Sequence, residues 1–301
     1  MKMKTRYLFS LAALALLTAA CSSDEMAQTP APAEQPAPAK QMIPFSAVIG
    51  SNAATTRVLA EAENGETIIA KWQKGEKIAL IHGEAIDTLE VSYVDATTGA
   101  ATITGDITSP TNNEAVNVVY VGHQLGCMGE FVNRLKECYE ASKGDRDLTA
   151  IPADIITEVI KERLSNQDGT LETISNKRDC RYTTSTLKVS DGTATFGSKV
   201  ELNPCFTIWK VNLVNERYQP FDAQKLEFDI FHPDNSYTPY FLDNGNMRST
   251  FYVAFIPDGT SYEFSTGIDP DIYKYTIHDI TLEIGKFYTS TLQLERWTDS
   301  I

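Results

Sequence analysis

The sequence predicts an all-β protein with two β-sandwich domains and a small helical insertion between them. Short runs rich in Val, Ile, Thr and Tyr recur along the chain, and turns that contain Gly or Pro separate them, which is typical of a sandwich. Apolar residues adopt helical spacing between residues 128 and 165. The chain has 301 residues, of which 42% are hydrophobic, so it is long enough for about two such domains.

Residues 1–20 predict a bacterial lipoprotein signal peptide. A basic stretch ends at Arg6, and the apolar stretch that follows, residues 7–17, is too short to span a bilayer. The run Leu17-Thr18-Ala19-Ala20-Cys21 is similar to a lipobox, in which the Cys becomes the lipid-modified first residue, although Thr18 stands where Leu is usual. We therefore expect palmitate on Cys21. The alternative is an ordinary secretory leader with an incidental Cys.

Residues 21–40 predict a Pro/Ala-rich tether. Pro recurs at positions 30, 32, 36 and 38, which favours an extended polyproline-like chain that cannot pack a core. The acidic residues 22–25 resemble a tag that directs some lipoproteins of Bacteroidales to the outer surface; the alternative is the solvated start of a linker. The net charge of −14 makes binding to nucleic acid or to an anionic lipid surface unfavourable.

Residues 43–49 predict the first strand of an N-terminal domain that covers residues 41–179. Polar and apolar side chains alternate there, which is the period-2 pattern of a half-buried strand. Four apolar side chains fall on one face: Ile43, Phe45, Ala47 and Ile49. Small and polar residues at 50–56 then predict an accessible loop that ends at Arg57, where a protease could cut. The alternative is that Arg57 is only a solvated residue and the strand a permanent edge strand.

The remaining elements divide between the two domains and the insertion. In the N-terminal domain, further strands are expected at residues 66–72, 77–82, 88–94, 100–107 and 115–121. Two amphipathic helices are expected within residues 128–165, the second of them opened by Pro152. The C-terminal domain covers residues 180–301 and begins with a tight hairpin at Asp191-Gly192. Its later strands are expected at residues 206–214, 226–231, 249–256, 261–265, 275–284 and 286–295.

The cysteines predict an oxidising compartment. Without Cys21, four remain, an even number that allows three pairings. Cys180 and Cys205 fall within one bulge of facing each other across the predicted hairpin, so we expect a disulfide between them. Cys127 and Cys138 are left as the second expected pair. A zinc site is the alternative, but no two of the four have CxxC spacing.

The sequence does not predict an enzyme, a metal site or a cofactor. There is no HExxH motif, no GxSxG motif and no glycine-rich phosphate loop after a strand. We expect all the histidines at the surface or at strand edges: His82, His123, His232 and His278. The acidic pairs at 61 with 63 and 269 with 271 lack EF-hand spacing and are expected to be solvated. Aromatic residues between 237 and 275 are expected mostly in the core, with a few able to stack on sugars.

Four short motifs, spread over nearly the whole chain, together resemble the fimbrillin family of Bacteroidales, the subunits of type V pili. They are the strand that ends in Thr56-Arg57, the block from Ala70 to Ile78, the segment from Gln167 to Leu171, and the closing stretch from Leu282 to Tyr288, whose Gly285-Lys286 turn leads into a last strand that ends near Trp297. The block after Trp72 carries Glu76 where the family usually has Asp.

The resemblance implies two transthyretin-like sandwiches in a lipid-anchored protein of the outer membrane surface. It also implies that an arginine-specific protease cuts after Arg57 and that a strand from another fimbrial subunit replaces residues 43–49 by donor-strand exchange. The expected function is that of a structural, accessory or tip subunit of a fimbria that serves adhesion to a host or bacterial surface. Because only residues 298–301 follow Trp297, a tip or accessory role is favoured. The alternative is a monomeric surface lipoprotein that binds glycans.

Overall fold

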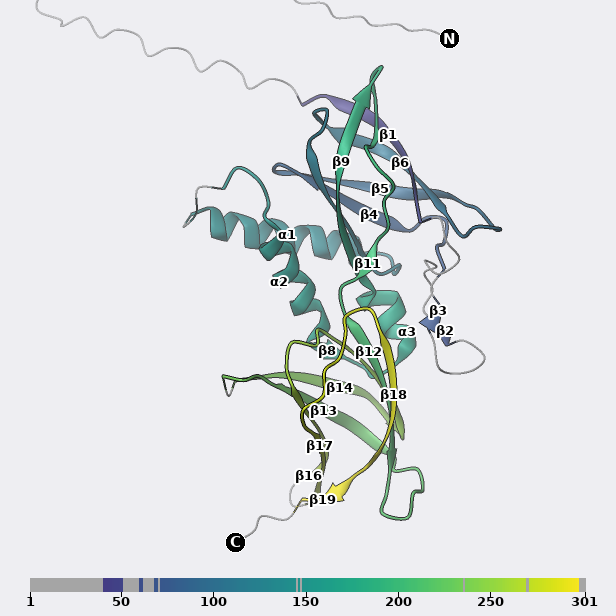
Figure 1. Cartoon of the computed structure of the whole chain (residues 1–301), viewed down its shortest axis with the longest axis vertical. Helices are drawn as coiled ribbons and strands as arrows, with labels where there is room; N and C mark the ends of the chain where they lie inside the picture. Colours follow the sequence, from purple (N-terminus) through teal and green to yellow (C-terminus); the bar gives the residue numbers. More distant parts are fainter. Residues whose placement is uncertain are drawn as a thin grey trace, which may run out of the picture. The chain divides into compact units, whose positions relative to one another are not determined.

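The computed structural model describes residues 40–50, 60–61, 68–69, 71–144, 146, 148–234, 236–268 and 271–297. Cys21, the tether up to residue 39, and Arg57 lie outside the described residues. The described part is mostly β-strand, with two long helices in the middle of the chain (Figure 1). The predicted all-β class with a helical insertion is therefore confirmed.

Eight strands form the first sheet, and this sheet closes on itself. Their order is β10-β1-β6-β5-β4-β7-β9-β11, and β10 pairs with β9 as well as with β1. The closed sheet surrounds its own apolar core, in which Ile78, Val91, Ile103 and Tyr120 are buried. The strands are β1 Met42–Ile49, β4 Lys77–His82, β5 Ala85–Val94, β6 Ala101–Thr108, β7 Ala115–Val121, β9 Cys180–Ser190, β10 Thr193–Phe196 and β11 Asn203–Pro204. The short strands β2 Ala60–Glu61 and β3 Ile68–Ile69 pair with each other.

The two predicted helices are α1 Cys127–Lys143 and α2 Ala153–Leu164, and they pack on the outer side of the first sheet. Phe131 of α1 and Ile156 of α2 share a buried apolar cluster with Ile81 of β4 and Val119 of β7. The apolar stripe of each helix therefore faces protein, as the spacing predicts. A short helix, α3 Leu171–Thr173, and a π-helical turn, η1 Ile174–Arg178, lead on to β9. Among the helices that the structure describes, none is long and apolar enough to cross a membrane.

The second β-domain consists of two sheets that share an aromatic core. One sheet has the order β15-β12-β18, and the other has the order β19-β17-β16-β13-β14-β8. Trp209 of β12 is buried, with its ring centroid 5.3 Å from that of Phe264 and 5.7 Å from that of Tyr262. Aromatic side chains thus fill much of the domain interior. The strands are β8 Asn166–Gln167, β12 Thr207–Val214, β13 Ala223–Phe231, β14 Tyr237–Arg248, β15 Thr250–Phe255, β16 Ser261–Ile268, β17 Asp271–Ile277, β18 Phe287–Gln293 and β19 Glu295–Arg296.

The segment 180–204 pairs with the first sheet and not with the C-terminal domain to which the sequence assigned it. β9 runs antiparallel to β7 over seven residue pairs, the last of which joins Val121 and Cys180. The predicted hairpin at Asp191-Gly192 is confirmed, because β9 and β10 pair on either side of it and both turn residues have positive φ. Local patterns predict a strand and its turn, whereas the partner strand depends on contacts that are remote in sequence.

Candidate functional site

β1 is a central strand with one buried face. It pairs antiparallel with β6 at all eight of its residues. Buried and exposed side chains alternate along it, and the contrast is large, since Phe45 is 2% exposed and Val48 is 58% exposed. The buried side chains are the four that the sequence placed on one face: Ile43, Phe45, Ala47 and Ile49. The predicted half-buried strand is therefore confirmed.

The buried face of β1 fills a groove between β6 and β10. Phe45 packs edge-on against Phe196 of β10, with ring centroids 5.0 Å apart. On the β6 side, Phe45 lies opposite Gly105, where an added Cβ would come within 2.8 Å of the Leu89 side chain. Because Gly105 has no side chain, the Leu89 side chain can pack beside β1 without a clash. Neither Phe196 nor Gly105 was predicted to line this groove, although a glycine inside a strand signals a close approach of this kind.

The two sides of β1 are held unequally. β6 contributes a continuous antiparallel ladder, whereas β10 runs parallel to β1 with one residue pair, Phe45 opposite Ala194. An isolated bridge between Ile49 and Val200, with a 3.1 Å hydrogen bond from Gly50 N–H to the Val200 carbonyl, completes that side. Because β1 lies between β6 and β10, it is not an edge strand, and the alternative is wrong on that point. Removal of β1 would expose an unpaired edge of β6 together with the apolar groove.

The predicted protease site lies in the sequence between β1 and β2. The chain passes from Gly50 through residues 51–59 to β2, and the predicted protease site at Arg57 falls in this interval, outside the described residues. The predicted lipidation site, Cys21, also lies outside them. In the sequence, Cys21 and β1 both precede Arg57. A single cut after Arg57 would therefore separate both of them from the rest of the chain.

The four other cysteines are free thiols in the structure. The predicted bond between Cys127 and Cys138 is wrong, because both lie on α1, and a rise of about 1.5 Å per residue separates them by roughly 16 Å, beyond the reach of a disulfide. The helix begins at Cys127, earlier than its apolar spacing indicated. Cys180 and Cys205 are cross-strand neighbours, since Cys205 N–H donates to the Cys180 carbonyl at 3.0 Å. Burial raises the pKa of Cys180 to about 12, which makes its thiol slow to oxidise, and this bond stays a prediction.

The motif block after Trp72 closes one end of the first core. Tyr120 lies edge-on to Trp72, with ring centroids 5.6 Å apart, and its hydroxyl donates to the buried carboxylate of Glu76. The other carboxylate oxygen of Glu76 accepts from Gln73 N–H at 2.7 Å. The carboxylate of Glu76 therefore provides acceptors for both of these donors.

The Gln167-Asp168-Gly169 motif joins the helical insertion to the second β-domain. The Gln167 side-chain amide connects β8 to β15, since it donates to the Ala254 carbonyl at 2.6 Å and accepts from Ala254 N–H at 2.9 Å. Gly169 has a φ of 74°, and a Cβ there would lie 2.6 Å from the Phe251 ring. Only glycine fits at position 169, because any other residue would be strained at this φ and would clash with the Phe251 ring. The motif thus lies where the local geometry demands particular side chains.

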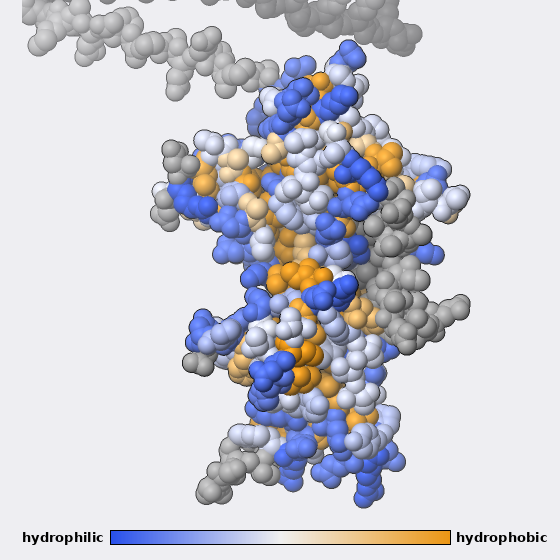
Figure 2. Space-filling view, in the orientation of Figure 1, coloured by the Kyte–Doolittle hydropathy of each residue, from blue (hydrophilic) through white to orange (hydrophobic). Residues whose placement is uncertain are grey.

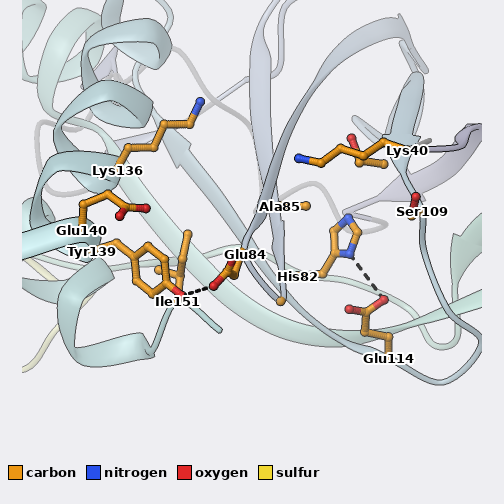
Figure 3. Close-up of a pocket in the computed structure, with 12 residues that line it drawn as sticks. Lys40, His82, Glu84, Ala85, Ser109, Glu114, Lys136, Tyr139, Glu140 and Ile151 are labelled. Carbon is orange, nitrogen blue, oxygen red and sulfur yellow. Dashed lines mark hydrogen bonds and ion pairs between the residues drawn. The ribbon is translucent and has the colours of Figure 1, made fainter. Parts of the chain in front are cut away.

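A cavity of about 480 Å³ lies at the start of β1 (Figure 3). His82 lines it, is 4% exposed, and has one ring nitrogen 3.0 Å from Asp87 and the other 3.3 Å from Glu114. The prediction of a surface or edge position is therefore wrong for His82. Other lining residues come from the chain before β1, from the β4–β5 turn, from the end of β6 and from α1: Lys40, Glu84, Ser109, Lys136, Tyr139 and Glu140. Gln41 N–H donates to Ser109 Oγ at 3.0 Å, so the start of β1 forms part of this site.

The two carboxylates around His82 favour its charged form. Burial lowers the pKa of His82, but hydrogen bonds and charge attraction from Asp87 and Glu114 outweigh burial and raise it above 6.5. Burial likewise raises the pKa of Asp87, but hydrogen bonds from His82 and Thr108 outweigh burial and lower it. His82 therefore adds stability that is full below its unfolded pKa and is lost as pH rises through its folded pKa. Asp87 adds stability above its own unfolded pKa that is lost in acid.

We expect the free energy of unfolding of the N-terminal domain to fall as the pH rises above about 6.5, the unfolded pKa of histidine. Urea denaturation between about pH 5 and pH 9 measures this dependence. The His82→Gln variant should lose most of it, because a neutral amide does not titrate. The matched control is His278→Gln, which changes an exposed histidine and should keep the wild-type dependence. The same pH dependence in wild type and His82→Gln would contradict the assigned role of His82.

The other candidate residues of the sequence form no common site. His123 and His232 are partly buried and His278 is exposed. Asp271 pairs with Arg296, whereas position 269 and the side chains at 61 and 63 lie outside what the structure describes. Within the described part of the chain, no three His, Cys, Asp or Glu side chains gather in a way that could hold a metal ion.

Comparison with known proteins finds similarity among solved structures. No family model and no curated protein matches the chain. A proposed cell adhesion protein from Bacteroides ovatus is 11% identical with a TM-score of 0.45, and the match covers 85% of this chain and 96% of that chain. A fimbrial assembly protein from Parabacteroides distasonis is 10% identical with a TM-score of 0.40, and the match covers 84% and 90%. A tip fimbrial protein from Porphyromonas gingivalis, solved with a C-terminal truncation, is 10% identical with a TM-score of 0.33, and the match covers 81% and 83%.

These structures are of the class that the sequence resemblance predicted. At TM-scores below 0.5 and identities of 10–11% they do not define the function of this chain.

Proposed function

We propose that this protein is a subunit of a cell-surface fimbria and assembles by exchange of β1 for a strand of another subunit. The observation that carries the proposal is the position of β1: a strand with one buried face lies inside a closed sheet, and Arg57 follows it in the sequence. In this proposal, Cys21 carries palmitate and anchors the precursor in the outer membrane. The two β-domains are transthyretin-like sandwiches, the subunit takes a tip or accessory position, and the fimbria serves adhesion.

The precursor is closed because β1 fills its own groove. Each large apolar side chain of β1 contributes about 1.5–3 kcal/mol by burial, so three of them stabilise the uncut domain strongly: Ile43, Phe45 and Ile49. A cut after Arg57 makes β1 a separate peptide that can leave. The same cut releases the body from its lipid anchor, so the release of β1 and the release of the subunit are coupled.

The groove defines the partner that can enter it. An incoming strand gains a ladder of backbone hydrogen bonds along β6, which is the general basis of strand addition. It also needs large apolar side chains where Phe45 and Ile49 lie, with polar residues allowed between them, because the opposite face of β1 is exposed. The proposed partners are therefore other fimbrial subunits with a free strand of alternating pattern, together with a processing protease.

Replacing Arg57 with Ala should preserve folding and lipidation but block assembly. The reason is that β1 then stays covalently attached and competes for the groove at very high effective concentration. The measurement is laddering on SDS gels of unboiled samples after the protein is mixed with the other fimbrial subunits and treated with an arginine-specific protease. The matched control is Arg217→Ala, which removes an exposed arginine in a loop of the second β-domain and should assemble like wild type. Fibres formed by Arg57→Ala with β1 still attached would contradict the mechanism.

The same gel separates the proposal from the alternative of a monomeric lipoprotein that binds glycans. A donor-strand polymer resists dissociation because strand pairing and apolar burial act together along the groove. A monomeric binder should run as a single band with and without boiling, whatever the protease treatment. A single band for the cut wild-type protein in the presence of the other fimbrial subunits would therefore favour the alternative.

A further inference from the structure

The last strands of the second β-domain surround an exposed tryptophan with polar side chains. Trp297 is 44% exposed, whereas Trp72 and Trp209 are buried. Its backbone is fixed, since Trp297 N–H donates to the Ile272 carbonyl at 2.7 Å. A cavity of about 510 Å³ lies beside it on β16, β17 and β19. The lower end of Figure 1, where β19 lies, carries mainly hydrophilic side chains in Figure 2.

The polar groups of this cavity hold one another in place. Lys274 Nζ lies 2.9 Å from Glu263 and 5.1 Å from the centroid of the Trp297 ring. Thr276 Oγ1 donates to the other Glu263 oxygen at 3.3 Å. In the register of β17 and β19, Glu295 lies opposite Lys274. Donors and acceptors are thus arranged around an aromatic ring on a rigid sheet before any ligand binds.

We propose that this cavity binds a neutral sugar residue of a surface glycan. Two cationic side chains, Lys274 and Arg296, and two anionic ones, Glu263 and Glu295, line it. Because the two signs balance, the lining favours neither an anionic nor a cationic ligand. A neutral sugar offers hydroxyl groups that can donate to the carboxylates and accept from the cations, and its C–H face can pack on the indole.

This inference deepens the adhesive part of the proposed function and rests on that function for its biological meaning. The site itself does not involve β1 or its groove. Trp297 directly follows β19 and is hydrogen-bonded to Ile272 of β17 in the second β-domain, whereas β1 belongs to the first sheet. Sugar binding and assembly can therefore be measured, and can fail, independently of each other.

The test uses the full-length protein and a panel of monosaccharides. Methyl β-galactoside, methyl α-mannoside and N-acetylglucosamine are the neutral probes, with N-acetylneuraminic acid as the anionic and glucosamine as the cationic comparison. Quenching of tryptophan fluorescence by acrylamide reports on Trp297 because the other two tryptophans are buried. At least one neutral sugar should reduce quenching, with a dissociation constant in the millimolar range, and should show saturation-transfer NMR signals.

Two variants and one control locate the site. Trp297→Ala should abolish the saturation-transfer signal, and Glu263→Gln should weaken binding about tenfold by removing one charged acceptor. Tyr218→Ala removes an exposed aromatic side chain elsewhere in the domain and should bind like wild type. The proposal is overturned if no neutral sugar binds, if only a charged sugar binds, or if Trp297→Ala binds as wild type does. If a variant loses sugar binding but still forms the normal SDS-stable ladder, its defect lies in the sugar site alone. If a variant binds sugar but forms no ladder, its defect lies in assembly alone.

Discussion

Replacing Phe45 with Ala should lower the free energy of unfolding of the N-terminal domain by about 3–5 kcal/mol, the usual range for truncating a buried Phe. Phe45 is almost fully buried, contacts the Phe196 ring and sits at the middle of β1, so its loss leaves a cavity that the closed sheet cannot easily fill. Denaturant unfolding of the uncut chain measures the loss. A change below about 1 kcal/mol would contradict the role of Phe45 as the main anchor of β1.

The matched control for this change lies on the same strand. Val48→Ala truncates an exposed side chain of β1 and should change the free energy of unfolding by no more than about 0.5 kcal/mol. Both variants keep the backbone ladder with β6. The difference between their free energies of unfolding therefore measures the contribution of the buried face of β1. Phe45→Ala should also release β1 faster after a cut at Arg57, because the strand is then held more weakly.

Deleting β1 should have a still larger effect. The buried face contributes about 5–9 kcal/mol from its three large side chains, which is comparable to the whole stability of a typical domain, about 5–15 kcal/mol. We expect a chain without residues 42–50 to expose its apolar groove and to be cut rapidly by proteases within the first sheet. A synthetic peptide of residues 41–50 should bind and restore resistance.

The control for this rescue is the same peptide with Phe45→Asp, which places a charge in the groove and should not restore resistance. If the chain without β1 is as resistant as the complete chain, β1 is not required to close the sheet. Equal rescue by both peptides would show that the groove does not select apolar side chains.

Features set by nearby residues could be predicted from the sequence. The alternation at 43–49, the hairpin at Asp191-Gly192 and the apolar stripes of α1 and α2 each depend on residues a few positions apart, and the structure has all of them. The direct approach of Cys180 and Cys205 was also predicted, because both lie near the same hairpin.

Features set by distant pairing could not be predicted in this way. β9 carries a strand pattern that suits either domain, and only its long ladder with β7 places it in the first sheet. His82 was expected at the surface because its partners, Asp87 and Glu114, become its neighbours only when β4, β5 and β7 assemble. The pairing of Cys127 with Cys138 failed for a local reason, since the helix starts at the first of them.

The most direct test of the proposed exchange follows the fate of β1. Purified precursor is mixed with the other fimbrial subunits and cut with an arginine-specific protease. The resulting polymer is isolated and dissociated by boiling, and mass spectrometry measures the peptide that ends at Arg57. Exchange predicts that this peptide is absent from the polymer and that each groove holds a strand of a neighbouring subunit. Recovery of the peptide in a one-to-one ratio with the polymer subunits would contradict it, because β1 would then still fill its own groove.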